Sequence, residues 1–182
     1  MSGRWLPLAL YVAAIYALVP VGPRIGLAVA RTGAGNWLLG PGVVVATAAG
    51  AMALGVRLHR RGAPPWSWAA LLGAAVAYLL AFAWLDRQHL ERTHLPEYGI
   101  AALLAWRAVA PRMRSPLAAY AVAALLAAAV GYGEELLQAV VPWRHYDLRD
   151  VAMNAVGAVL GVVLIAVARA GRPRDVQVRA AC

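Results

Sequence analysis

Apolar runs long enough to cross a lipid bilayer constrain this chain more than any other feature. A transmembrane helix needs about 20 mainly apolar residues, because the hydrocarbon core is about 30 Å thick and a helix rises about 1.5 Å per residue. The alternating pattern of membrane-barrel strands is missing, so the runs predict helices. The sequence therefore predicts an all-α, polytopic membrane bundle of about six transmembrane helices, at 5–21, 37–58, 66–85, 95–110, 117–132 and 151–168.

Composition and aromatic placement agree with a membrane protein. The 182 residues are 63% hydrophobic and only 14% charged, against about 25% charged in an ordinary soluble domain. All seven tryptophans fall at or near predicted span ends, where an amphipathic ring prefers the headgroup level. The formal charge of +9 comes from arginines scattered between apolar runs and not from a basic face, so we expect no nucleic-acid partner.

The first apolar run has an alternative interpretation. Arg4, a short apolar run and the small residues Ala28-Val29-Ala30 resemble a secretory signal with its cleavage site. Pro23 and Arg24 interrupt that arrangement and favour a retained span. Cleavage would leave five spans in the same orientation.

The distribution of charge predicts an orientation. Cytoplasmic loops of membrane proteins are enriched in arginine and lysine. Six spans with both termini in the cytoplasm place most arginines inside, while Asp175 is the only one of the eight acidic residues on that side. The chain then divides into a three-span region without motifs, a three-span region with polar motifs and a basic cytoplasmic tail, at 1–85, 86–168 and 169–182.

The external acidic residues recur with helical spacing. Residues three and four apart share one face of a helix, and buried polar groups in a membrane tend to face the bundle and find partners. We therefore expect a small polar pocket, open to the outside and walled by the last three spans. The spacing is found in three groups: Glu91, His94, Glu97 and Tyr98; Glu134, Glu135 and Gln138; and Asp147, Asp150, Asn154, Gly157 and Gly161.

The order of these motifs resembles that of the VanZ-like membrane proteins. The match covers about residues 86–165, and its signature reads ExxHxxEYG, then ExxQ, PxRxxDxxD and NxxGxxxG. Here these patterns begin at Glu91, Glu135, Pro142 and Asn154. Pro96, directly before Glu97, departs from the pattern and leaves the depth of His94 open. The resemblance implies a multi-pass protein of the bacterial cytoplasmic (inner) membrane, linked through the family's namesake to resistance against the glycopeptide teicoplanin. It implies no reaction.

Three interpretations of the pocket stay open. In the first, it binds or shields a lipid-linked or peptide headgroup of the cell envelope, such as a wall precursor or the glycopeptide, with Gln138, Arg144, Asn154 and Tyr98 as binding residues. In the second, it is a metal-assisted or acid-base enzyme whose catalytic candidates are Glu135, Asp150, Asp147, His94, Glu97 and Glu91. In the third, the charged residues form pairs that tie helix ends together.

Other site chemistry is less well supported. Ser2, Ser67 and Ser115 fall near the inner side, so a serine nucleophile beside the acids is not expected. Glu134-Glu135 also resembles intramembrane proteases of the prenyl-protease type, but Ala139 occupies the position of their arginine. We expect no organic cofactor, with a divalent metal as an open alternative, and Gly157 and Gly161 to pack helices closely. The sequence does not indicate an oligomeric state.

The orientation can be tested with reporter fusions. Alkaline phosphatase, which is active only outside the cytoplasm, should be active when fused within 86–94 or 141–147. It should be inactive when fused within 61–65 or 111–115, where green fluorescent protein should fluoresce instead. Activity in the reverse pattern would contradict the predicted orientation.

Overall fold

The computed structural model describes residues 3–37, 41–84 and 93–171, and within these ranges every regular element is a helix. The predicted all-α class is therefore confirmed for the described residues. The elements are α1 (Leu6–Leu18), α2 (Gly22–Ala30), α3 (Gly33–Trp37), α4 (Val43–Arg60), α5 (Pro65–Trp84), α6 (His94–Val109), η3 (Ala110–Arg112), α7 (Pro116–Val140) and α8 (Leu148–Arg169).

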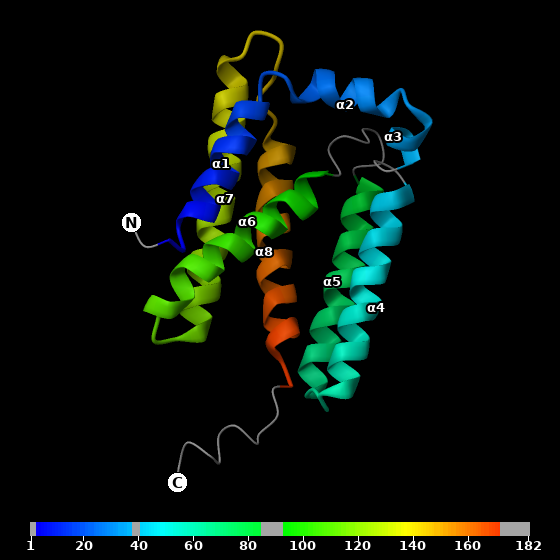
Figure 1. The fold of residues 1–182 in the computed structure, drawn as a ribbon, viewed down its shortest axis with the longest axis vertical. Coiled ribbons are helices and arrows are strands. Elements are labelled where there is room, and N and C mark those ends of the chain that lie inside the picture. Colours follow the sequence, from blue (N-terminus) through cyan, green and yellow to red (C-terminus); the bar gives the residue numbers. More distant parts are fainter. Residues whose placement is uncertain (1–2, 38–40, 85–92, 172–182) are drawn as a thin grey trace.

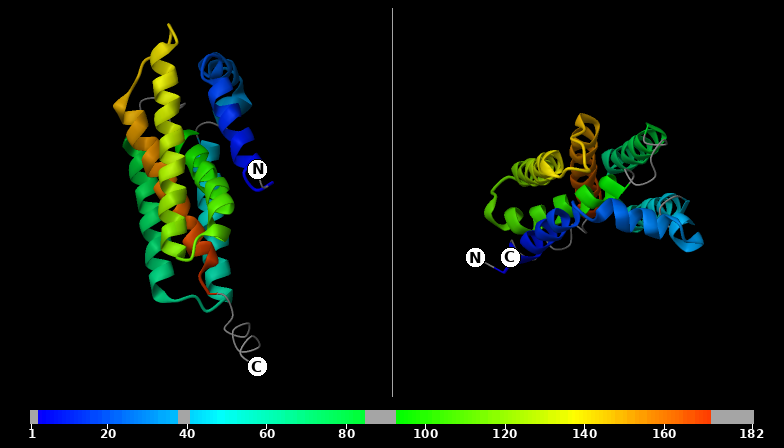
Figure 2. Two further views of the ribbon diagram at one scale, coloured as in Figure 1. Left: turned by 90° about the vertical axis from the view of Figure 1, so that its left-hand side faces the viewer. Right: turned by 90° about the horizontal axis from the view of Figure 1, so that it is seen from above.

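The long helices alternate in direction along one axis (Figure 1). In that view α1, α5 and α7 run upward, α4, α6 and α8 run downward, and α2 lies across the upper end. Helix α6 is steeply inclined against α7 and α8, and the view from above shows α1 and α2 lying along one side of the bundle (Figure 2). We call the end of the bundle that carries α2 and the α7–α8 loop the upper end (Figure 1).

Within the described ranges, three helices, α4, α7 and α8, are long and apolar enough to cross a membrane. Helices α1 and α2 together form a fourth candidate, bent by 78° between them, and Pro65–Ala81 of α5 is a shorter apolar helix. These features support a membrane-embedded bundle. The count of six crossings stays a prediction.

The packing of α6, α7 and α8 forms the centre of the molecule. Helix α6 buries a face of small residues, including Ala101, Ala102 and Ala105, around the fully buried Tyr98. Close approach between α6 and α8 requires glycine. A Cβ added at Gly161 would lie 2.7 Å from Gly99 Cα, and one added at Gly157 would lie 2.9 Å from the Leu95 carbonyl oxygen. Small residues of this kind let membrane helices pack backbone against backbone.

Two boundaries differ from those expected. Helix α7 continues to Val140, about two turns beyond the predicted span, so Glu134, Glu135 and Gln138 all lie on it. Gly22-Pro23, expected in a connecting piece, instead begins α2. Proline is tolerated in the first turn of a helix, where its missing N–H would have no intrahelical partner.

Replacing Gly161 by alanine should destabilise the bundle by about 1–3 kcal/mol, because the new methyl group would push α8 away from the α6 backbone. The matched control is Gly73→Ala in α5, where nothing lies within 4 Å of the added Cβ. That variant should unfold at or slightly above the wild-type temperature, since alanine is the better helix former. Thermal unfolding of both variants in detergent is the measurement, and equal melting temperatures would contradict the packing.

Candidate functional site

A cavity of about 660 Å³ lies at the upper end of the bundle. Its two sides differ in chemistry. The polar side comes from α6, α7, α8 and the loop between the last two, and consists of Thr93, His94, Glu97, Glu134, Gln138, Trp143, Arg144, His145, Asp147 and Asp150. The other side comes from α1 and α2 and consists of Ile15, Leu18, Val19, Gly22, Pro23, Ile25, Gly26 and Val29.

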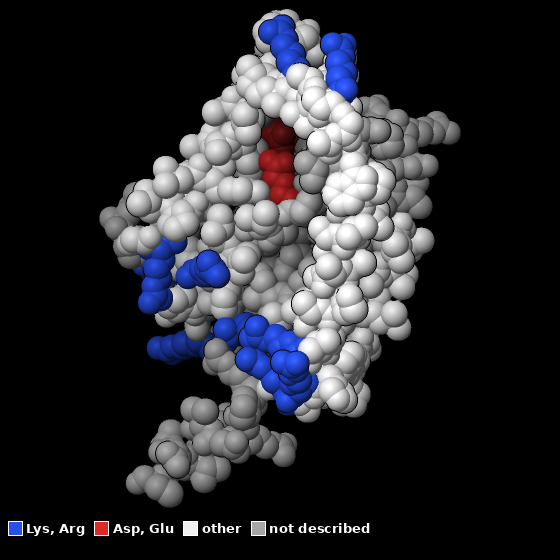
Figure 3. Space-filling view, turned by 45° about the vertical axis from the view of Figure 1, so that its right-hand side comes forward, with Lys and Arg blue, Asp and Glu red and all other residues white. Residues whose placement is uncertain are grey.

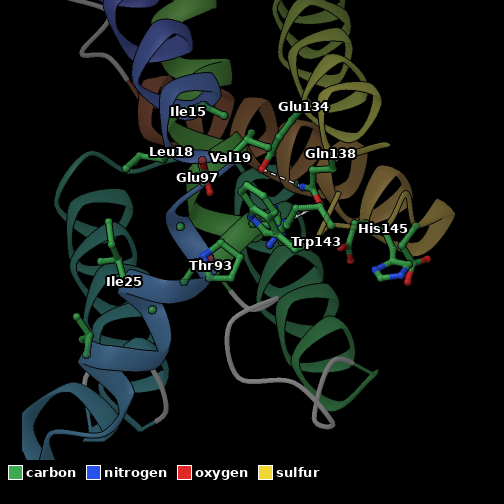
Figure 4. A pocket seen from close by; sticks show the side chains of 18 residues that line it. Ile15, Leu18, Val19, Ile25, Thr93, Glu97, Glu134, Gln138, Trp143 and His145 are labelled. Atoms are coloured by element: carbon green, nitrogen blue, oxygen red, sulfur yellow. Dashed lines mark hydrogen bonds between the residues drawn. The ribbon is translucent and has the colours of Figure 1, made fainter. Parts of the chain in front are cut away.

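The cavity is reached from the side of the bundle. Seen perpendicular to the long axis, acidic side chains lie at the back of a hollow surrounded by uncharged surface (Figure 3). The labelled residues come from several elements, with Glu97 near Val19 at the centre, Ile25 to one side and His145 to the other (Figure 4).

Gln138 is the central member of the polar network. Its Nε2 donates hydrogen bonds to Glu135 Oε1 at 2.9 Å and to Glu134 Oε1 at 3.2 Å. Its Oε1 accepts two hydrogen bonds from Arg144, from Nε at 3.1 Å and from Nη2 at 2.5 Å. Because Gln138 is 1% exposed, its amide satisfies both carboxylates and the guanidinium where water does not reach it.

Glu135 connects the end of α7 to the start of α8. Its side chain is completely buried, and its Oε2 accepts a hydrogen bond from the Asp147 backbone N–H at 3.2 Å. Asp147 in turn caps α8, because its Oδ1 accepts from the Arg149 N–H at 2.8 Å. Asp150 follows in the first turn of α8, where the helix dipole favours negative charge. Glu135 therefore holds the loop from beneath and does not line the cavity.

Tyr98 and His94 continue the network onto α6. The buried Tyr98 hydroxyl donates to Glu134 Oε2, and the His94 ring stacks near the Tyr98 ring with centroids 6.3 Å apart. His94 is 9% exposed, and its Nδ1 has no hydrogen-bond partner within the described part of the chain. The buried Oδ1 of Asp150 likewise lacks one there. Both residues line the cavity, while these two atoms are themselves buried.

Asn154 has a different position. It is completely buried, its Nδ2 donates to the Gly131 carbonyl oxygen at 3.3 Å, and it does not line the cavity. A Cβ at Gly131 would lie 2.5 Å from the Asn154 Cβ. Asn154 is therefore a contact between α7 and α8, and its predicted role as a binding residue stays a prediction.

Helix α1 is fixed to the site by two tyrosine hydroxyls. Tyr11 donates to the backbone oxygen of Glu97, and Tyr16 donates to that of Val130, each at 3.1 Å. The corner between α1 and α2 is held to the α7–α8 loop, since Trp143 Nε1 donates to the Pro20 oxygen at 3.0 Å. The Arg24 guanidinium of α2 lies 5.1 Å from the centre of the Trp143 ring.

The structure brings most sequence-predicted site residues together. His94, Glu97, Gln138, Arg144, Asp147 and Asp150 line the cavity, Tyr98 and Glu135 lie behind it, and Glu91 falls outside the described residues. Gly157 and Gly161 lie against α6. Glu134 was among the spaced residues expected at the pocket but was given no catalytic or binding role. The sequence analysis missed the apolar wall from α1 and α2, which carries no motif.

Arg144 lines the cavity, and two of its nitrogens donate to Gln138 Oε1. Its role as a binding residue stays a prediction. Among the described residues, no group of three or more His, Cys, Asp or Glu side chains is arranged to hold a metal ion.

Comparison of the chain with protein-family profiles, with curated proteins and with solved structures finds no match.

Replacing Gln138 by methionine tests the network. Methionine fills a similar volume but leaves Glu134, Glu135 and Arg144 without their amide partner, so we expect a loss of about 1–3 kcal/mol in stability. Leu136→Met is the matched control on the same turn, because Leu136 is 48% exposed. Melting temperatures in detergent give the comparison. Equal stability of the two variants would show that the amide does not hold these groups.

Proposed function

We propose that this protein binds the polar headgroup of a cell-envelope amphiphile in the cavity between α1–α2 and the last three helices. The observation that carries the proposal is the cavity's division into one polar and one apolar side. A headgroup would contact the polar side, while the adjoining chain would lie against Ile15, Leu18 and Ile25. Sites for small molecules combine apolar walls with a few placed polar groups in this way.

The position of the opening supports a ligand that comes from the bilayer. The hollow is visible perpendicular to the long axis of the helices (Figure 3). For helices that cross a membrane along this axis, such an opening faces lipid and not bulk water. An amphiphile could therefore enter sideways without leaving the bilayer.

The proposed topology has six crossings, both termini in the cytoplasm and the cavity at the external face of the bacterial inner membrane. Two observations support it. The long helices alternate in direction (Figure 1), and arginines Arg57, Arg60, Arg61 and Arg169 lie at the end away from the cavity. In a positive-inside arrangement that end is cytoplasmic.

The VanZ-like resemblance is consistent with this proposal. Six of its polar positions line one cavity, namely His94, Glu97, Gln138, Arg144, Asp147 and Asp150. The envelope-facing site that the resemblance implies would take a wall precursor or a glycopeptide such as teicoplanin as candidate ligands. The resemblance supports glycopeptide resistance as one process in which headgroup binding would serve the cell. Binding or shielding requires no reaction at the site.

An acid-base membrane enzyme is the second candidate. The observation in its favour is that His94 and Asp150 both line the cavity and each has a buried side-chain atom, Nδ1 and Oδ1, without a partner within the described residues. An imidazole and a carboxylate of this kind can transfer a proton to and from a bound substrate. A divalent metal would have to be held by fewer than three of the described His, Cys, Asp or Glu side chains, together with other ligands.

A tryptophan that fills the cavity tests ligand binding. Ile25 lines the cavity and is 50% exposed, so Ile25→Trp adds volume there without disturbing a buried position. We expect the purified full chain to carry a co-purified envelope amphiphile that this variant loses. The measurement is extraction and mass spectrometry of lipids bound per protein.

The matched control is Leu27→Trp on the same helix. Leu27 is 51% exposed and does not line the cavity, so this variant should retain the bound amphiphile. The same lipid content in both variants would contradict binding in the cavity. If the wild-type protein converts an envelope substrate and Asp150→Asn does not, the result would favour the enzyme instead.

A further inference from the structure

The cavity that we propose as a headgroup site has an unbalanced set of charges. Among the residues that the structure describes, four carboxylates line it, from Glu97, Glu134, Asp147 and Asp150, against one guanidinium, that of Arg144. Two nitrogens of Arg144 are already hydrogen-bonded to Gln138. An anionic headgroup would therefore meet several like charges and a guanidinium that is already partly engaged.

The unused hydrogen-bonding atoms point to the same conclusion. Asp150 lines the cavity, and its buried Oδ1 has no partner among the described residues, so a donor that reached this oxygen would satisfy it. His94, which is about nine-tenths buried, lines the same cavity, and its buried Nδ1 has no partner among the described residues. A buried polar atom without a partner carries a cost that a ligand removes by forming the missing hydrogen bond.

The arrangement of the acidic side chains favours a larger cation over a bare metal ion as the ligand. Within the described ranges, no three carboxylate or imidazole groups converge as the ligands of a metal ion. They are spread over the start of α6, the end of α7 and the start of α8. A positively charged group with several N–H donors can contact acceptors that are separated in this way, because each hydrogen bond has its own direction.

We infer that the ligand is an amphiphile whose headgroup carries a primary ammonium, held by the carboxylates of Glu97, Glu134 and Asp150. The apolar side from α1 and α2 accommodates the attached chain, and the sideways opening admits it from the bilayer. This inference rests on the proposed headgroup binding and names its ligand class. The source is a membrane lipid and not a free amine, because the cavity also provides an apolar side, formed by Ile15, Leu18, Val19, Ile25 and Val29.

The test uses the full chain in nanodiscs and phosphatidylethanolamine as the probe. Native mass spectrometry compares its binding with that of phosphatidylcholine, whose methylated nitrogen donates no hydrogen bond, and of phosphatidylglycerol, which lacks the nitrogen. Phosphatidylethanolamine should bind best. Asp150→Asn and Glu97→Gln should each weaken it about tenfold, the change expected from losing one charge-assisted hydrogen bond.

Asp175→Asn is the control for loss of charge, since it removes one carboxylate from the tail at residues 169–182 and should bind like wild type. Equal binding of all three lipids, preference for phosphatidylglycerol, or wild-type binding by both cavity variants would overturn the inference. Soluble phosphoethanolamine is a further probe, and competition by it at concentrations equal to those of the lipid would overturn the lipid source.

The outcomes separate this inference from the proposal beneath it. If Ile25→Trp removes bound lipid but the three headgroups bind alike, headgroup binding stands and the ammonium preference fails. If no lipid binds in the cavity of the wild-type protein, both fail.

Discussion

The buried amide of Gln138 is the interaction on which the rest of the site depends. It joins two glutamates of its own helix to the arginine of the following loop within a bundle whose other contacts are largely apolar. Carboxylates in such surroundings are costly unless hydrogen bonds satisfy them. The network therefore fixes where α7 ends, how the loop turns and where α8 begins.

The close packing of α6 and α8 makes this network possible. Gly99, Gly157 and Gly161 bring the two backbones together, which places His94 and Glu97 at the start of α6 beside Asp150 at the start of α8. Apolar residues further along α6 fill the space beneath them. The same small residues that hold the bundle together thus set the positions of the polar side chains around the cavity.

The sequence predicted the helical class and most of the polar side of the cavity because both depend on local periodicity. The spacing of Glu135, Gln138, Asp147 and Asp150 places them at one end of adjacent helices, and this does not depend on how the other helices are arranged. The apolar side could not be predicted this way, because Ile15 and Ile25 are ordinary apolar residues whose role comes from the 78° bend between α1 and α2. The division of labour between Asn154, which packs, and Asp150, which lines the cavity, also required the three-dimensional arrangement.

The central claim is that α1 and α2 close the acidic side of α6–α8 into one cavity. A photoreactive benzoylphenylalanine at position 143 tests it most directly, because the Trp143 side chain contacts the backbone of Pro20 and the Arg24 guanidinium. Irradiation in native membranes followed by peptide mapping should give cross-links within residues 18–25. Cross-links to lipid or to other helices alone, with none to the corner between α1 and α2, would contradict the account.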